Sequence, residues 1–88
     1  MTHFKTMIER MLHLINEAQM YAGLYGKDEE LKDIYYTLAM GHLDMANKVK
    51  VAIASYLNKE DHPDERTVWM QMKDIFQRMC DTIKEELM

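Results

Sequence analysis

Apolar residues recur every three or four positions along most of this chain, the spacing that places them on one face of an α-helix. The longest such stretch, residues 29–57, contains no proline and a single glycine. We interpret it as one long central helix against which both flanking segments pack. Its main apolar row has the alternating spacing of a helix in a bundle. The row consists of Leu31, Tyr35, Leu38, His42, Met45, Val49, Ala52 and Tyr56.

A second apolar row lies beside the first on the same stretch, and Lys50 interrupts it. Its members are Ala39, Leu43, Ala46, Ile53 and Leu57. Because a helix with one partner needs only one buried row, two rows predict that the central helix contacts both of its neighbours.

The segments before and after this stretch carry one main apolar row each. In the first segment the row is Phe4, Ile8, Met11, Ile15, Ala18, Ala22 and Tyr25. In the last segment it is Trp69, Met72, Phe76, Met79 and Ile83. Each row predicts an amphipathic helix that buries one face.

Two short breaks separate these segments. Gly26 suits the residue after a helix, where a left-handed backbone is often needed, and Asp28 is a good N-cap for the next helix. Pro63 fits the first turn of a third helix, so His62 before it is expected outside the helix. We therefore expect helices at about residues 2–25, 28–58 and 63–87. Short links between them favour an all-α, up-down-up antiparallel three-helix bundle.

The length and composition are those of one small globular domain, residues 1–88. A chain of 88 residues has room for one core, and its 48% hydrophobic and 30% charged residues argue against disorder. Because small domains are marginally stable, we expect this chain to self-associate as a homo-oligomer.

The charge balance bears on the partners. The net charge is −4, which disfavours nucleic acid and anionic membrane surfaces. No uncharged apolar run is long enough to span a membrane, and Glu9 and Arg10 interrupt the N-terminal apolar run, so we expect a cytoplasmic protein without a signal peptide. Cys80 is the only cysteine, which excludes an internal disulfide and a multi-cysteine zinc site.

His42 is the first candidate for chemistry, because it occupies an apolar row between Leu38 and Met45. A buried imidazole needs a polar partner. It could bind a metal or face a polar pocket. Alternatively, it hydrogen-bonds a nearby carboxylate or tyrosine, or lies at an edge of the bundle.

Glu9, His13 and Glu17 recur every four residues and share one stripe of the first helix. Glutamate and histidine at this spacing can bind one divalent metal. The same spacing is also common on solvated faces, where such pairs stabilise a helix slightly.

The ten methionines and five tyrosines suit either gap-filling in a small core or an adaptable protein interface. The residues that we select as interface candidates are Tyr21, Tyr25, Tyr36, Met40, Trp69 and Met70. Cys80 fits a small, half-buried apolar position better than a nucleophile. We find no Ser-His-Asp order, glycine-rich phosphate loop or HExxH motif, so we predict no catalytic residue and no cofactor.

One stretch of the central helix carries a family resemblance. It reads Tyr36-x-Leu38-Ala39-x-x-x-Leu43-x-x-Ala46-Asn47-Lys48. With the preceding Tyr21-Ala22, the acidic turn, the Pro63 loop and Trp69, it resembles small ferritin-like helical proteins encoded in phages and prophages of Gram-positive bacteria. The resemblance implies a fold related to the four-helix bundle, in which a dimer would supply the missing helix. Ferritin-like di-iron proteins use Glu-x-x-His on a helix. The matching positions here are His42 and Met45, and methionine cannot replace imidazole as a ligand for a hard metal.

These observations predict a non-enzymatic helical protein that acts through self-association or a protein partner. The alternative is a metal-binding ferritin-like protein that uses His42 with Asp44, Glu9, His13 or Glu17. A nucleic-acid-binding regulator fits less well, because the helices are too long for a helix-turn-helix module and the chain is acidic.

Overall fold

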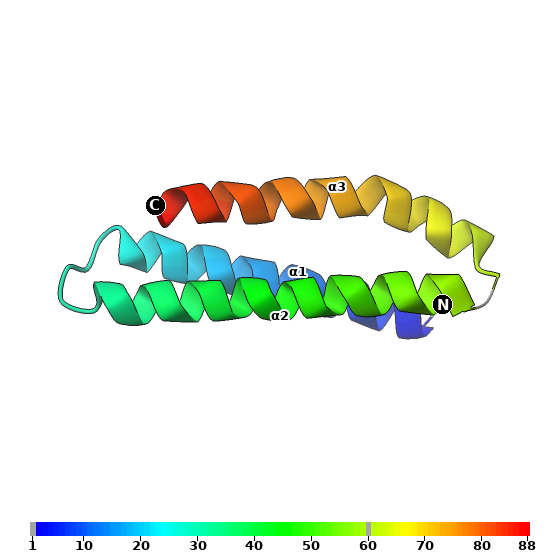
Figure 1. Cartoon of the computed structure of the whole chain (residues 1–88), viewed down its shortest axis with the longest axis horizontal. Coiled ribbons are helices and arrows are strands. Elements are labelled where there is room, and N and C mark those ends of the chain that lie inside the picture. The colour runs from blue at the N-terminus through cyan, green and yellow to red at the C-terminus, as the bar shows by residue number, and fades with distance from the viewer. Residues whose placement is uncertain (1, 60) are drawn as a thin grey trace.

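The chain forms three α-helices in an up-down-up arrangement (Figure 1). The computed structural model describes residues 2–59 and 61–88, including the backbone but not the side chain of residue 2. The helices are α1 (Thr2–Tyr25), α2 (Lys32–Lys59) and α3 (Pro63–Glu86), and the described residues contain no strand. The predicted all-α fold is therefore confirmed: it has three helices, and each runs antiparallel to the helix before it in the chain.

The first connection differs in detail from the prediction. The helix α1 ends before Gly26 as expected, but no described residue has a positive φ, so this glycine does not adopt the left-handed conformation. The Asp28 carboxylate accepts hydrogen bonds from the backbone N–H groups of Glu30 and Leu31, at 3.0 and 3.1 Å. Asp28 thus caps a separate turn, and α2 begins at Lys32 rather than at residue 28.

The second connection is close to the prediction. His62 lies outside the helix, and Pro63 is the first residue of α3. The guanidinium of Arg66 donates a hydrogen bond of 2.8 Å to the carbonyl oxygen of Leu57, near the end of α2. This bond holds the first turn of α3 against the last turns of α2.

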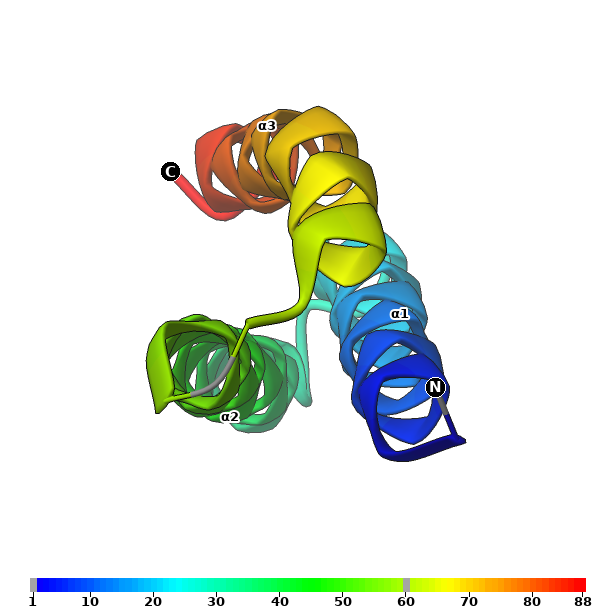
Figure 2. The ribbon, with the colours of Figure 1, turned by 90° about the vertical axis from the view of Figure 1, so that its right-hand side faces the viewer.

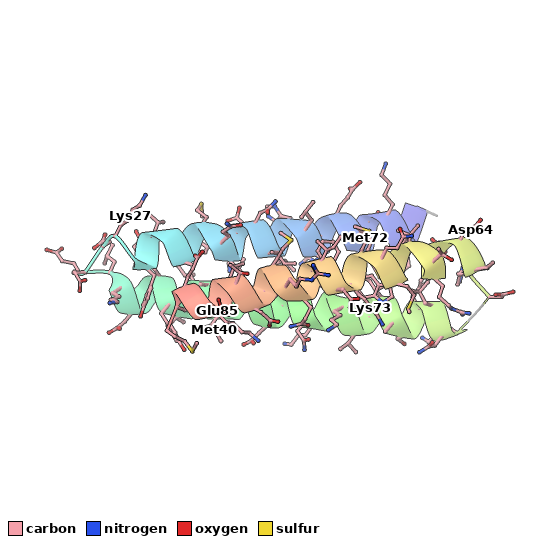
Figure 3. All side chains as sticks on the ribbon, turned by 90° about the horizontal axis from the view of Figure 1, so that it is seen from above. Lys27, Met40, Asp64, Met72, Lys73 and Glu85 are labelled. Atoms are coloured by element: carbon pink, nitrogen blue, oxygen red, sulfur yellow. The ribbon has the colours of Figure 1, made fainter. Side chains whose placement is uncertain are left out.

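The helices α1 and α2 lie side by side as a layer, and α3 covers one side of it (Figure 2). Viewed from above, α3 runs over the groove between them, with Met72 on the side of α1 and Lys73 on the side of α2 (Figure 3). The closest packing is between α1 and α2, and α3 lies closer to α1 than to α2. The central helix predicted from the sequence does contact both neighbours, but α1 rather than α2 is the main support of α3.

Both α1 and α2 contribute buried alanines to the core. Ala18 and Ala22 of α1 and Ala39 and Ala46 of α2 have at most 3% of their surface exposed. Small side chains of this kind let two helices approach closely. Larger buried side chains such as Ile15 and Ile53 fill the rest of the core.

The buried row of α2 is not the row that the sequence pattern ranked first. The buried residues of α2 are Ala39, Leu43, Ala46, Ile53 and Leu57, which is the whole of the second predicted row. In the first predicted row, Leu31 and Met45 are 41% and 39% exposed, Ala52 is exposed, and the others are half-buried. The physical reason is that the close approach to α1 accommodates the alanine-containing row, which leaves the bulkier row at the edge of the contact.

The apolar row of α3 is buried or half-buried, as predicted, and it includes the interface candidate Trp69. Trp69, Phe76 and Ile83 are buried, and the Trp69 and Phe76 rings lie 6.5 Å apart. Trp69, one of the interface candidates, is 6% exposed and packs inside the single chain. An indole at this position is the largest side chain available to fill the space between α3 and the layer beneath it.

Candidate interaction surface

The side of the α1–α2 layer that faces away from α3 is open (Figure 2). On α2, the flank toward α3 is marked by Lys50, whose ammonium donates a 2.9 Å hydrogen bond to the Gln77 amide oxygen of α3. Asn47 lines the cleft on this same flank. Since successive helical residues are about 100° apart, Met45 points almost opposite to Asn47 and therefore away from α3.

The part of α2 that faces away from α3 is apolar over most of its length. Its apolar members are Ile34, Leu38, Met45, Val49 and Ala52, and Leu31 in the turn just before α2 continues the row. Ile34 is 55% exposed, and Leu31 and Met45 are close to 40% exposed. At 1.5 Å per residue these side chains form a strip about 30 Å long. The solvated side of a helix normally carries charged residues instead, so this strip is unusual for a surface.

The part of α1 beside this strip is polar. Gln19 lines a hollow with residues of α3, so Glu17, two residues earlier, points to the opposite side of α1. Arg10 joins Met45, Val49 and the exposed Lys48 around a shallow hollow of about 180 Å³ between α1 and α2. Arg10 and His13 are exposed and Glu17 is half-buried. We call the α2 strip together with Arg10, His13 and Glu17 the uncovered face.

His42 lies at the edge of the uncovered face and is held within the chain. Its Nδ1 is 2.8 Å from the carbonyl oxygen of Leu38, and because a carbonyl only accepts, Nδ1 carries the proton. Its ring is 5.2 Å from the Tyr21 ring of α1. His42 can therefore be half-buried because its N–H group donates to a backbone carbonyl one turn earlier. An aromatic ring on the other helix packs beside it.

The tyrosine interface candidates lie near the connection between α1 and α2. Tyr21 stacks with Tyr35 at 6.4 Å, and Tyr25 lies 5.9 Å from Tyr36. The ammonium of Lys32 sits 4.9 Å from the centre of the Tyr25 ring, within the range of a cation–π contact. Tyr21 and Tyr25 therefore join α1 to α2 within one chain, whereas Tyr36 is 42% exposed.

The two methionine interface candidates lie on different helices. Met40 is half-buried at the outer edge of α2 (Figure 3). Met70 of α3 is 56% exposed. The structure places neither residue on the uncovered face, so the predicted interface set is dispersed over the molecule.

The metal-ligand candidates are also dispersed. Glu9 is exposed and forms a 3.9 Å ion pair with Lys5 one turn earlier. Asp44 lines the cleft between α2 and α3, away from His13 and Glu17 on the uncovered side of α1. Within residues 2–59 and 61–88, no three histidine, cysteine, aspartate or glutamate side chains are placed to hold one metal ion.

The cleft between α2 and α3 has a volume of about 230 Å³ and holds the single cysteine. Burial raises the pKa of the Cys80 thiol above its usual range; the nearby Lys84 ammonium opposes part of this shift. A thiol with a raised pKa is mostly protonated at neutral pH and is a weak nucleophile. The Lys50–Gln77 hydrogen bond crosses the same cleft and ties its two walls together.

A polar cluster at the connection between α2 and α3 was not predicted from the sequence. Glu65 is 4% exposed, and its Oε1 accepts a 3.1 Å hydrogen bond from the Tyr56 hydroxyl. The same oxygen lies 3.0 Å from Nδ1 of His62, whose ring stacks on Tyr56 at 4.5 Å. The ring of His3 from α1 meets the other side of this group, 5.2 Å from Tyr56. A glutamate three residues after His62 was the signal available in the sequence.

No described helix is both long and apolar enough to cross a membrane. Comparisons of the chain with models of known protein families, with characterised proteins and with solved structures found no match. The resemblance to ferritin-like phage proteins therefore rests on the residues given for it above.

Proposed function

We propose that this protein has a non-enzymatic role and works by binding another protein chain through the uncovered face. The observation that supports the proposal is the apolar strip of α2, which has bundle-like spacing but is not covered within the chain. Contiguous exposed apolar surface is uncommon on monomeric proteins and marks interaction sites. Polar Arg10, His13 and Glu17 beside the strip supply the mixed rim that protein interfaces have.

The proposal agrees with the expected architecture of the assembly. Covering an antiparallel pair of helices with two more helices produces a four-helix bundle, the class that the ferritin-like resemblance implies. We extend the proposal to a phage-derived, cytoplasmic accessory protein, as the sequence resemblance and composition suggest. In such an assembly α3 would lie outside the shared bundle and stabilise α1 and α2 from behind.

Site-specific photocrosslinking in cells that express the protein tests this function. A photoreactive benzoylphenylalanine is placed at position 45, and in a control at position 51. Val51 is 60% exposed and lies about 120° away from Met45 around α2. We expect crosslinks to a protein chain from position 45 and few from position 51. Equal labelling at both positions, or none at position 45, would contradict the proposed function.

A further inference from the structure

We propose that the chain bound at the uncovered face is a second copy of this protein, packed antiparallel about a two-fold axis at the level of Met45. This inference rests on the proposed function and adds the identity and the register of the partner. In such a dimer α2 packs on α2 and α1 packs on α1 of the second copy, with α3 on the outside of each copy.

The dimensions of the face suit a dimer. The molecule extends 50 Å along the helices and 15 Å in the direction in which α1 and α2 lie side by side (Figure 2). A face of this size offers on the order of 800 Å² per copy, the area of a standard interface. A helix with its side chains is about 10 Å across, so a single docked helix would leave part of the width of this face uncovered.

The middle of the apolar strip is self-complementary in size about Met45. In an antiparallel pair, residues equally far from the axis along α2 face each other. Leu38 then meets the second copy's Ala52, and Gly41 meets the second copy's Val49. At these two levels a larger side chain lies opposite a small one, which allows the two copies of α2 to interdigitate, whereas nearer the ends Ile34 meets the second copy's Tyr56. Two Met45 side chains meet at the axis, and methionine adapts its shape well to such contacts.

The register between α1 and α2 then fixes the charges that face each other. Met45 lines the same hollow as Arg10 and Leu14, so the axis crosses α1 near residue 14. Arg10 and Glu17 lie on either side of that level, so each Arg10 faces the second copy's Glu17. His13 lies close to the same carboxylate.

The ends of the face add a second complementary pair. In the register centred on Met45, Lys59 at the end of α2 faces the second copy's first turn, where Glu29 and Glu30 are exposed. Both Lys59 and these carboxylates are on the surface, so their pairing supports orientation more than affinity.

The alternative two-fold arrangement, with the axis along the helices, is disfavoured by the same charges. It places α1 of one copy over α2 of the other. Arg10 would then lie near the second copy's Lys48, which lines the hollow on the uncovered face. Like charges facing each other across an interface oppose association. This pair of cations favours the antiparallel dimer, in which Arg10 faces a carboxylate instead.

Sedimentation equilibrium of the purified full-length protein tests the partner. We expect a dimer, a dissociation constant at least about a hundredfold higher for Met45→Lys, and little change for Val51→Lys. Circular dichroism should show that both variants fold, because both positions are substantially exposed. A wild-type protein that stays monomeric over the whole range of concentration would overturn the inference. So would a dimer that Val51→Lys weakens as much as Met45→Lys does.

Two further variants test the register. Glu17→Arg should weaken the dimer, because it places two cations together, and adding Arg10→Glu should restore it. In a Cys80→Ala background, Met45→Cys should form a disulfide-linked dimer under mild oxidation, whereas Val51→Cys should not. No rescue by the double variant, or no Met45→Cys link, would refute the antiparallel register.

These outcomes separate the inference from the proposed function. A monomeric purified protein whose position 45 crosslinks to a different protein in cells would retain the function and refute the second copy. A protein that does not crosslink at position 45 and does not dimerise would refute both.

Discussion

Two single substitutions in α2, Ala46→Leu and Ala52→Leu, test which apolar row of this helix is buried in the core of the fold. Ala46 belongs to the second apolar row and is 1% exposed, whereas Ala52 belongs to the first row and is exposed. Both lie in the interior of the same helix, so the small loss of helix propensity from alanine to leucine is the same at both positions. The difference between the two variants therefore reports packing alone.

At position 46 the added carbons must enter the interface between α1 and α2, where Ala18 and Ala22 also allow close approach. Overpacking of this kind costs about 1–3 kcal/mol. A domain of 88 residues has a total stability of roughly 4–13 kcal/mol. Ala46→Leu is thus expected to remove a large fraction of the stability, while Ala52→Leu should change it by less than about 0.5 kcal/mol.

Urea unfolding followed by circular dichroism provides the assay, at a protein concentration where sedimentation shows a monomer. With a slope of about 1–1.5 kcal/mol per molar urea, a cost of about 1–3 kcal/mol should lower the Ala46→Leu midpoint by roughly 0.7–3 M at constant slope. If Ala52→Leu lowers the midpoint as much as Ala46→Leu or more, the assignment of the two rows is wrong. The uncovered face would then be part of the core of the single chain.

Three other predictions concern parts of the molecule outside the uncovered face. Tyr56→Phe should lower the free energy of unfolding by about 1–3 kcal/mol in urea titrations, because the buried Glu65 carboxylate loses a hydrogen-bond donor; an unchanged midpoint would contradict the bond. Cys80 should react with iodoacetamide more slowly in the folded protein than in urea, and Lys84→Met should slow it further by raising the thiol pKa; equal rates with and without Lys84 would refute that electrostatic contribution. Gly23→Ala should raise the thermal midpoint by an amount equivalent to about 0.5–1 kcal/mol, since Gly23 is helical and no neighbouring atom lies within 4 Å of an added Cβ; a lower midpoint would show a contact there.

The helices and their order could be predicted because local signals determine them. Apolar spacing identified three helical segments, Gly26 marked the end of α1, and Pro63 marked the start of α3. The start of α2 was wrong because Asp28 accepts hydrogen bonds from two backbone N–H groups in a preceding turn. A capping residue shows that a turn follows, but the sequence does not show how soon regular helix begins after it.

The buried row of α2 could not be predicted because both rows satisfy the same spacing rule. The choice between Ala46 and Met45 as the core residue depends on how closely α1 approaches, which is a property of the pair of helices. The cluster around Glu65 was missed for a related reason. Tyr56 and His62 come from the end of α2 and the following turn, and they meet the glutamate only after α3 folds back.

The misassigned row is itself the best indication of the interface. A helix whose two sides both follow bundle spacing has two sides to bury, and α3 covers only one side of the α1–α2 layer. If the first row had no partner, selection for solubility would favour charged residues at exposed positions such as Ile34 and Met45. Polar residues appear instead on α1 beside the strip, where Arg10 and Glu17 can pair in only one of the two dimer arrangements. Apolar spacing along α2 thus indicates that its second side is buried in an assembly, and the charges on α1 indicate how that assembly is oriented.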